Sequence, residues 1–177
     1  MLTHIKEIMP ISFKSKQTLD KERAFTLLPA DDYELVITDT KKDIRAKYMK
    51  PDEEEEVVNF TMEIVGLRDG IPAKDIEGKD ATSRKIFFTG RTGSLGFQQD
   101  GTPAKMRCLV AYALGLEVNE DFDLEDWEDL AGKTIFAEIV QYKNSKGNES
   151  NKISRFLLPP KKRDVDVKDE DIPVINP

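Results

Sequence analysis

The most regular alternation of hydrophobic and polar residues lies between Val57 and Val65. Every second residue there is apolar: Val58, Phe60, Met62 and Ile64. A period of two is typical of a β-strand with one buried face. Two further strands are predicted at Tyr33–Thr40, with its apolar residues on one face, and at Arg84–Thr89.

The predicted connections between these strands are long. After the first strand, the pattern predicts a turn at Asp39–Asp43 and then a basic segment at Ile44–Pro51. The acidic run Asp52–Glu56 closes this connection. Gly66–Ser83 contains three glycines and a proline, which is typical of a loop.

A helix is predicted at Thr102–Leu116. Pro103 suits its first turn and Gly115 its end. The apolar stripe consists of Met106, Leu109, Val110, Ala113 and Leu114. A further acidic helical turn is expected at Leu124–Leu130, with Asp123 as its N-cap.

Two β-rich runs follow, Lys133–Lys143 and Asn151–Leu158. The turn-forming residues Asn144–Ser150 between them include a lysine, which predicts a β-hairpin with a basic tip. The order strand, strand, strand, helix, strand, strand is that of a five-stranded Greek-key barrel of the OB type. The sequence therefore predicts a mainly β fold with the helix between strands 3 and 4.

The chain divides into three predicted regions: an N-terminal arm (1–30), an OB-fold domain (31–160) and an acidic C-terminal tail (161–177). The tail combines high charge with prolines, a composition typical of disorder. No apolar run is long enough to span a bilayer, and the N-terminus lacks the core of a secretory signal. With Cys108 as its one cysteine, the chain forms no internal disulfide, so a cytoplasmic location is expected.

The net charge of −7 is unevenly distributed. Asp52–Glu56 carries −5, Glu117–Asp129 carries −8 and Asp164–Pro177 carries −4. These segments together carry −17, so the remaining residues sum to +10. This basic remainder is compatible with a polyanionic ligand, which the net charge alone would argue against.

Enzyme signatures are absent from the sequence. His4 is the one histidine, so no histidine-rich metal site or His/Cys ligand set is available. Gly132-Lys133-Thr134 lacks the earlier glycine of a phosphate-binding loop, because Trp127 occupies that position. We therefore expect no enzymatic activity, no cofactor and no metal. The enzymatic alternative is a magnesium-dependent nuclease that uses Asp52–Glu56.

Three groups of basic and aromatic residues are the candidates for nucleic-acid binding. They are Lys41, Lys42, Arg45, Lys47, Tyr48 and Lys50 in the first connection, Arg84 and Arg91 around the third strand, and Tyr142, Lys143, Lys146, Lys152 and Arg155 around the last hairpin. Lys85 and Phe87 belong to the second group, and Phe156 to the third.

In an OB barrel the first and last connections lie on the same side, flanking strands 2 and 3. The three groups are therefore expected to converge in one groove. Lysine and arginine attract phosphates there, and unpaired bases stack on aromatic rings. In the alternative interpretation, the lysines only increase solubility, and the phenylalanines Phe87, Phe88, Phe136 and Phe156 fill the barrel.

The span Tyr33–Pro159, about 70% of the chain, resembles phage-encoded single-stranded DNA-binding proteins and their OB-fold relatives. The residues that carry the resemblance are Tyr33-Glu34-Leu35, Cys108–Gly115, Leu130–Lys133, Gly147–Ile153 and Phe156–Pro159. The resemblance implies a non-catalytic protein that coats single-stranded DNA in a phage-like replication, recombination or repair system. Its location would then be the cytoplasm of the bacterial host.

The tail carries a second resemblance. Asp169, Glu170, Asp171, Ile172 and Pro173 are similar to the acidic tip of bacterial single-stranded DNA-binding proteins, which recruits replication and repair enzymes. That tip ends in phenylalanine after the proline, whereas Val174 follows here. By resemblance, the tail can also fold over the basic groove and compete with DNA; a purely solubilising tail is the alternative.

Two functions are weighed against each other. The first is single-stranded DNA binding, and the second is an OB-fold adaptor or virion component that binds a polypeptide. The sequence leaves open the tail's partner, the choice between DNA and RNA, and whether the chain forms a homo-oligomer.

Overall fold

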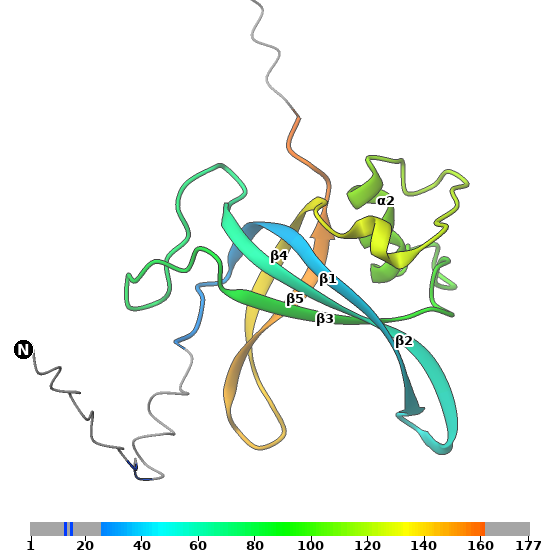
Figure 1. Ribbon diagram of the computed structural model, residues 1–177, viewed down its shortest axis with the longest axis horizontal. Coiled ribbons are helices and arrows are strands. Elements are labelled where there is room, and N and C mark those ends of the chain that lie inside the picture. Colours follow the sequence, from blue (N-terminus) through cyan, green and yellow to red (C-terminus); the bar gives the residue numbers. More distant parts are fainter. Residues whose placement is uncertain (1–12, 14, 16–25, 162–177) are drawn as a thin grey trace, which may run out of the picture.

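The computed structural model describes residues 13, 15 and 26–161 (Figure 1). Within these ranges the strands are β1 (Asp31–Lys47), β2 (Lys50–Leu67), β3 (Lys85–Arg91), β4 (Thr134–Lys143) and β5 (Glu149–Leu157). The helix α2 (Lys105–Leu114) lies between β3 and β4, and the short 3₁₀ helix η1 (Trp127–Leu130) precedes β4. The predictions of a mainly β fold and of a helix between the third and fourth strands are confirmed.

The strands form one antiparallel sheet in the order β3-β2-β1-β4-β5. The central strand β1 pairs with β2 over nearly its whole length, but with β4 only over Asp31–Val36. In the part of the chain that the structure describes, β3 and β5 are the two edges of the sheet. The sheet is therefore not closed into the barrel that the sequence predicts.

Aromatic side chains connect the two edges of the sheet. Phe88 of β3 and Phe156 of β5 pack edge to face, with ring centroids 5.1 Å apart and planes at 87°. Phe60 of β2 lies 6.1 Å from Phe88 on the inner side. Such pairs stabilise beyond the area they bury. The sheet curls around one core and brings its edges together through side chains.

The hairpin of β1 and β2 is longer than the sequence predicts. Residues expected as a turn, a basic segment and an acidic run are strand residues, joined by a tight turn at Tyr48 and Met49. A register shift between Ile37 and Asp39 inserts an extra residue on β1. A bulge of this kind moves the following side chains to the opposite face. The apolar alternation therefore stops at Ile37 although the strand continues, and the predicted long connection is wrong.

The core lies between the inner face of the sheet and α2. The sheet contributes the fully buried Tyr33, Leu35, Ile37, Phe60, Met62, Ile64, Ile135 and Ile139, and α2 contributes Met106, Leu109 and Val110. Gly90 of β3 lies where Met106 packs; a Cβ there would lie 2.4 Å from the Met106 sulfur. The glycine therefore permits the close approach of helix and strand.

Both described helices are short. α2 ends at Gly115, which adopts φ 70° and donates its N–H to the carbonyls of Ala111 and Tyr112. The predicted helix is confirmed with narrower bounds. η1 begins at Trp127 and its N-cap is Asp126, so the expected N-cap at Asp123 is wrong. Among the described residues, no helix has the length and apolarity needed to cross a bilayer.

The end of the predicted N-terminal arm belongs to the domain. Leu28 is fully buried. Its backbone N–H donates to the side chain of Asn151, and its carbonyl accepts from Gln141 and Asn151. Predictions on residues 1–12, 14, 16–25 and 162–177, including the partner-binding segment Asp169–Pro173, lie outside the described residues.

Candidate nucleic-acid interface

Three basic residues near the tip of the β1–β2 hairpin lie beside carboxylates of the acidic run. Arg45 Nε is 3.1 Å from Glu55 Oε1, and Lys47 Nζ is 2.6 Å from Glu53 Oε2. Lys50 Nζ is 3.5 Å from the other Glu53 oxygen. The Lys47 ammonium donates to Glu53 and lowers the pKa of that carboxyl below its ordinary value. Charges that are separated in the sequence are therefore paired in space, and each carboxylate offsets part of the basic segment.

Four of the candidate lysines keep their charge uncompensated. In residues 26–161, no carboxylate lies within ion-pairing distance of Lys41, Lys42, Lys146 or Lys152. All four are exposed. Lys152 lies over the ring of Tyr142, with its Nζ 5.1 Å from the ring centroid. These lysines are the strongest available contacts for phosphate.

The β4–β5 hairpin has the basic tip that the sequence predicts. Asn144 accepts the backbone N–H groups of Lys146 and Asn148, and Gly147 adopts φ 80°, so the turn is well defined. Lys143 is 3.8 Å from Glu149 on the neighbouring strand. The hairpin therefore presents Lys146 at its tip and Tyr142 on its stem.

The two hairpins extend toward the same side of the molecule. In Figure 1 the β1–β2 hairpin points to the lower right and the β4–β5 hairpin to the bottom, with β3 crossing above them. Lys47, Tyr142 and Lys146 are thus on elements that project in one general direction. The convergence of the three groups in one groove stays a prediction.

The outer face of β3 carries an exposed aromatic ring. Phe87 is 69% exposed, while its neighbours Ile86 and Phe88 turn inward. Phe87 pairs in register with Thr61 of β2. The next pair on the same face is Thr89 with Asn59, whose side chains are hydrogen-bonded at 2.7 Å. The sequence left open whether Phe87 stacks on bases or fills the core. Because its side chain lies outside the core, it does not fill the core. The alternation of inward and outward residues along β3 could have indicated this position.

Arg91 lies at the end of the same outer row. It pairs in register with Val57 of β2, and its Nε is 3.5 Å from Glu55 Oε2. Its side chain is more than half exposed. Arg91 therefore borders the outer face that Phe87 occupies and remains accessible to a phosphate.

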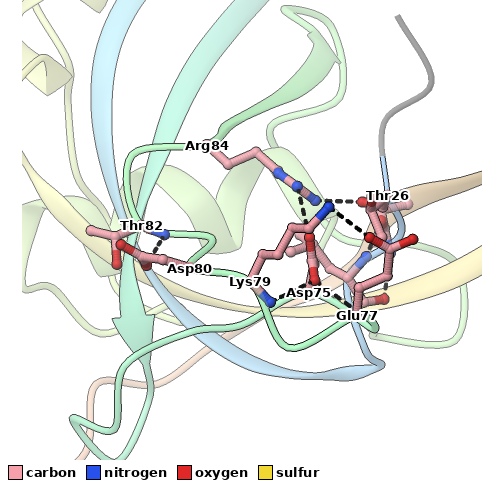
Figure 2. Close-up of polar contacts among 9 residues, drawn as sticks. Thr26, Asp75, Glu77, Lys79, Asp80, Thr82 and Arg84 are labelled. Atoms are coloured by element: carbon pink, nitrogen blue, oxygen red, sulfur yellow. Dashed lines mark hydrogen bonds and ion pairs between the residues drawn. The ribbon is translucent and has the colours of Figure 1, made fainter. Parts of the chain in front are cut away.

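Arg84 lies apart from this face and has a structural role. Figure 2 shows its side chain directed toward Asp75 and Thr26. Its Nη2 is 3.5 Å from Asp75 Oδ2, and its Nη1 donates to the Thr26 carbonyl. Asp75 is only 4% exposed and also accepts the N–H groups of Glu77 and Lys79. Arg84 thus anchors the β2–β3 loop. Because its guanidinium is engaged there, it is not among the residues that we propose to contact phosphate.

Arg155 is also engaged within the fold. Its guanidinium lies 2.8 Å from Glu138 Oε2 of the neighbouring strand, and its Nε donates to the same oxygen. Because Glu138 already offsets its charge, Arg155 is a weaker candidate than the lysines without partners.

The tip of the β1–β2 hairpin is apolar as well as basic. Tyr48 is 91% exposed and Met49 is 82% exposed, and Ile44 on β1 is also exposed. Only Tyr48 was a sequence candidate. Met49 and Ile44 were missed because the segment was taken for a connection. A projecting tip with three exposed apolar side chains is suited to a contact with another molecule.

The carboxylates of the acidic run are spread along the β1–β2 hairpin. Along β2 its carboxylates alternate between the two faces of the hairpin, and Glu53 and Glu55 are held by cations. In the described ranges no group of three or more His, Cys, Asp or Glu residues is placed to hold a metal ion. The geometry therefore gives the nuclease alternative no support.

Comparison with protein-family models finds no match to this chain, and a search of curated proteins finds none either. The resemblance to phage-type single-stranded DNA-binding proteins therefore stays a prediction.

Proposed function

We propose that the chain is a non-catalytic, OB-type domain that binds single-stranded DNA along the outer face of β1, β2 and β3. The observation that carries the proposal is the exposed ring of Phe87 on that face, in the same outward-facing row of β3 as Arg91. An exposed ring on a sheet face is a surface on which an unpaired base can stack.

The chemistry of this face suits an unpaired strand. Phe87, Tyr48 and Tyr142 offer rings on which bases stack, at about 1–3 kcal/mol for each base. In a duplex the bases are already stacked on each other, so these rings gain nothing from it. Stacking and phosphate contacts depend little on base identity, so little sequence preference is expected on this face.

The phosphate contribution is modest because most of the basic residues are already paired. Among the candidates in the first connection and the last hairpin, Lys41, Lys42, Lys146 and Lys152 have no ion-pair partner in residues 26–161. Four phosphate contacts give a slope of log affinity against log salt of about −3 for a single strand. Affinity therefore depends on stacking at least as much as on charge.

The test is a titration of a labelled oligo-dT, followed by fluorescence anisotropy at several salt concentrations, with a duplex of the same length in parallel. The proposal expects binding of the single strand, a salt slope near −3 and much weaker binding of the duplex. Absence of binding at low salt, or equal affinity for the duplex, contradicts it.

A second candidate function is supported by the tip of the β1–β2 hairpin. Ile44, Tyr48 and Met49 are exposed together at this tip. Exposed apolar patches of this kind mark protein contacts as well as ligand sites. An OB-type adaptor or virion component that binds a polypeptide through this tip would ignore oligo-dT and would lose its partner in Met49→Asp. The proposed recruitment of replication or recombination proteins by the tail segment Asp169–Pro173 is a separate prediction.

A further inference from the structure

A small pocket lies where β1 separates from β4. The last backbone bonds on this edge join Ile37 to Gly132 and Lys133, at 2.7 and 2.9 Å. Beyond Ile37 no strand in the described part of the chain covers this edge of β1, and the segment that contains η1 lies against it instead. The pocket has a volume of about 260 Å³ and is lined by Thr40, Lys41, Lys42, Asp126, Trp127 and Glu128.

Trp127 gives the pocket an aromatic wall. Its ring packs edge-on against the buried Phe60, with centroids 6.2 Å apart and planes at 80°. The ring is half-buried, so one part is fixed against the core and the rest remains accessible beside the lysines. A fixed, partly exposed indole is a favourable surface for stacking a planar ligand.

The polar groups around Trp127 suit a base and its phosphate. The buried hydroxyl of Thr40 has no hydrogen-bond partner among the described residues, which is uncommon for a buried polar atom. Lys41 and Lys42 carry unpaired positive charge. Asp126 uses one carboxylate oxygen to cap η1, which leaves its other oxygen free to accept a hydrogen bond.

We propose that this pocket holds one unpaired nucleobase that carries an exocyclic amino group, stacked on Trp127, with its phosphate beside Lys41 and Lys42. The proposal rests on the proposed function and adds to it a fixed base position on the opposite edge of β1 from β2 and β3. The volume is below the ~300–1000 Å³ of sites for drug-sized ligands, so it suits one base. Carboxylates only accept hydrogen bonds, so Asp126 and Glu128 favour an amino-bearing base such as cytosine.

Trp127 is the one tryptophan of the chain, so its fluorescence reports on this pocket alone. The experiment titrates the full chain with short oligo-dC and oligo-dT, following tryptophan emission and the anisotropy of a labelled strand. The proposal expects saturable quenching that parallels binding, and stronger quenching by oligo-dC at equal saturation. Binding without quenching overturns the pocket while the proposed function stands. Equal quenching by both strands overturns the preference for a base that carries an amino group. Absence of binding overturns both the pocket and the proposed function.

Three variants separate the pocket from the outer face. Trp127→Leu keeps an apolar side chain against Phe60 but offers no ring, and it should weaken oligo-dC binding at least about fivefold, the lower end of the effect of one stacked base. Lys41→Ala combined with Lys42→Ala should weaken binding and reduce the magnitude of the salt slope by about 1.4. Lys74→Ala, on the β2–β3 loop and without an ion pair in residues 26–161, is the control that should change nothing. If Trp127→Leu binds like the wild type while Phe87→Ala is weakened, the pocket proposal is overturned and the proposed function stands.

Discussion

Arg45 and Glu55 face each other across β1 and β2, with 3.1 Å between Nε and Oε1. The second oxygen of Glu55 lies 3.5 Å from Arg91 on β3, so one carboxylate contacts two arginines from different strands. The two arginine side chains are 47% and 57% exposed, whereas the Glu55 side chain is 13% exposed. Under the proposed function, a phosphate of the bound strand competes with Glu55 for these arginines, so that Glu55 would be an internal competitor.

Neutralising this competitor should strengthen binding. Glu55→Gln frees Arg45 and Arg91, and we expect about a two- to fivefold gain in affinity for oligo-dT at low salt, because an exposed pair contributes up to about 1 kcal/mol. Glu77→Gln changes the charge equally but lies in the β2–β3 loop, where Glu77 pairs with Lys79, and should have no effect. An unchanged or lower affinity of Glu55→Gln would show that the two arginines do not contact the strand.

Replacing Arg84 should reduce the stability of the fold, whereas replacing Arg91 should reduce the affinity for single-stranded DNA. Arg84→Ala leaves the buried Asp75 carboxylate without its cation, and we expect a loss of about 3 kcal/mol in the free energy of unfolding. Arg91→Ala removes an exposed side chain and should reduce oligo-dT affinity with little change in stability. Urea unfolding and anisotropy titration of both variants check this. The reverse pattern would restore Arg84 as a binding residue.

The close packing of β3 against α2 should require glycine at position 90. In Gly90→Ala the new Cβ meets the buried Met106 side chain, with the sulfur at 2.4 Å, so the core must shift. We expect a loss of about 1–3 kcal/mol in the free energy of unfolding, as for other overpacked cores. Gly93→Ala is the matched control because nothing lies within 4 Å of its Cβ position. Equal urea midpoints for the two variants would argue against this packing.

Tyr33 should make the fold sensitive to alkaline pH. Burial, together with the nearby Asp31 carboxylate, raises the pKa of Tyr33 to about 12 from an ordinary value of 10. The folded chain therefore holds this proton more tightly than the unfolded chain. The resulting stabilisation is complete below pH 10 and is lost as pH rises from about 10 to 12.

Tyr33→Phe tests this dependence. The variant loses the hydrogen bond to the Pro29 carbonyl, at 2.8 Å in the wild type, which should cost about 1 kcal/mol at pH 7. Its stability should then fall less steeply than the wild type above pH 10. Tyr112, whose pKa burial also raises, retains its own contribution. Parallel slopes of unfolding free energy against pH in the two proteins would contradict the assignment.

The sequence predicts which strands and helices are present better than it predicts where each begins and ends. The alternation at Val58, Phe60, Met62 and Ile64 marks the buried part of β2, and the helix appears from its apolar stripe and its terminal glycine. The hairpin beyond Ile37 could not be recognised in this way, because a bulge changes the face and ion pairs replace apolar contacts. The sequence also suggests separate basic and acidic segments, whereas ion pairs across β1 and β2 bring Arg45 and Lys47 next to Glu55 and Glu53.

Candidate residues depend on contacts that a sequence does not display. Arg84 is basic and adjoins a strand, but its partner Asp75 is brought to it by the loop between them. Phe87 could have been recognised, because Ile86 and Phe88 on either side of it alternate with it on β3. The sequence did not indicate Trp127 as a site residue. Its pocket exists because β1 continues beyond the end of its pairing with β4, which a sequence pattern does not show.

The most direct test of the central claim is the affinity of Phe87→Ala for a labelled oligo-dT at low salt. Phe87 is exposed and fills no part of the core, so the variant should fold like the wild type. Ile71→Ala, a loss of exposed apolar surface on the β2–β3 loop, is the control. The account predicts that Phe87→Ala binds about 5- to 150-fold more weakly, the effect of one lost base stack, while Ile71→Ala binds normally. Equal affinities of Phe87→Ala and the wild type would contradict a strand bound on the outer face of the sheet.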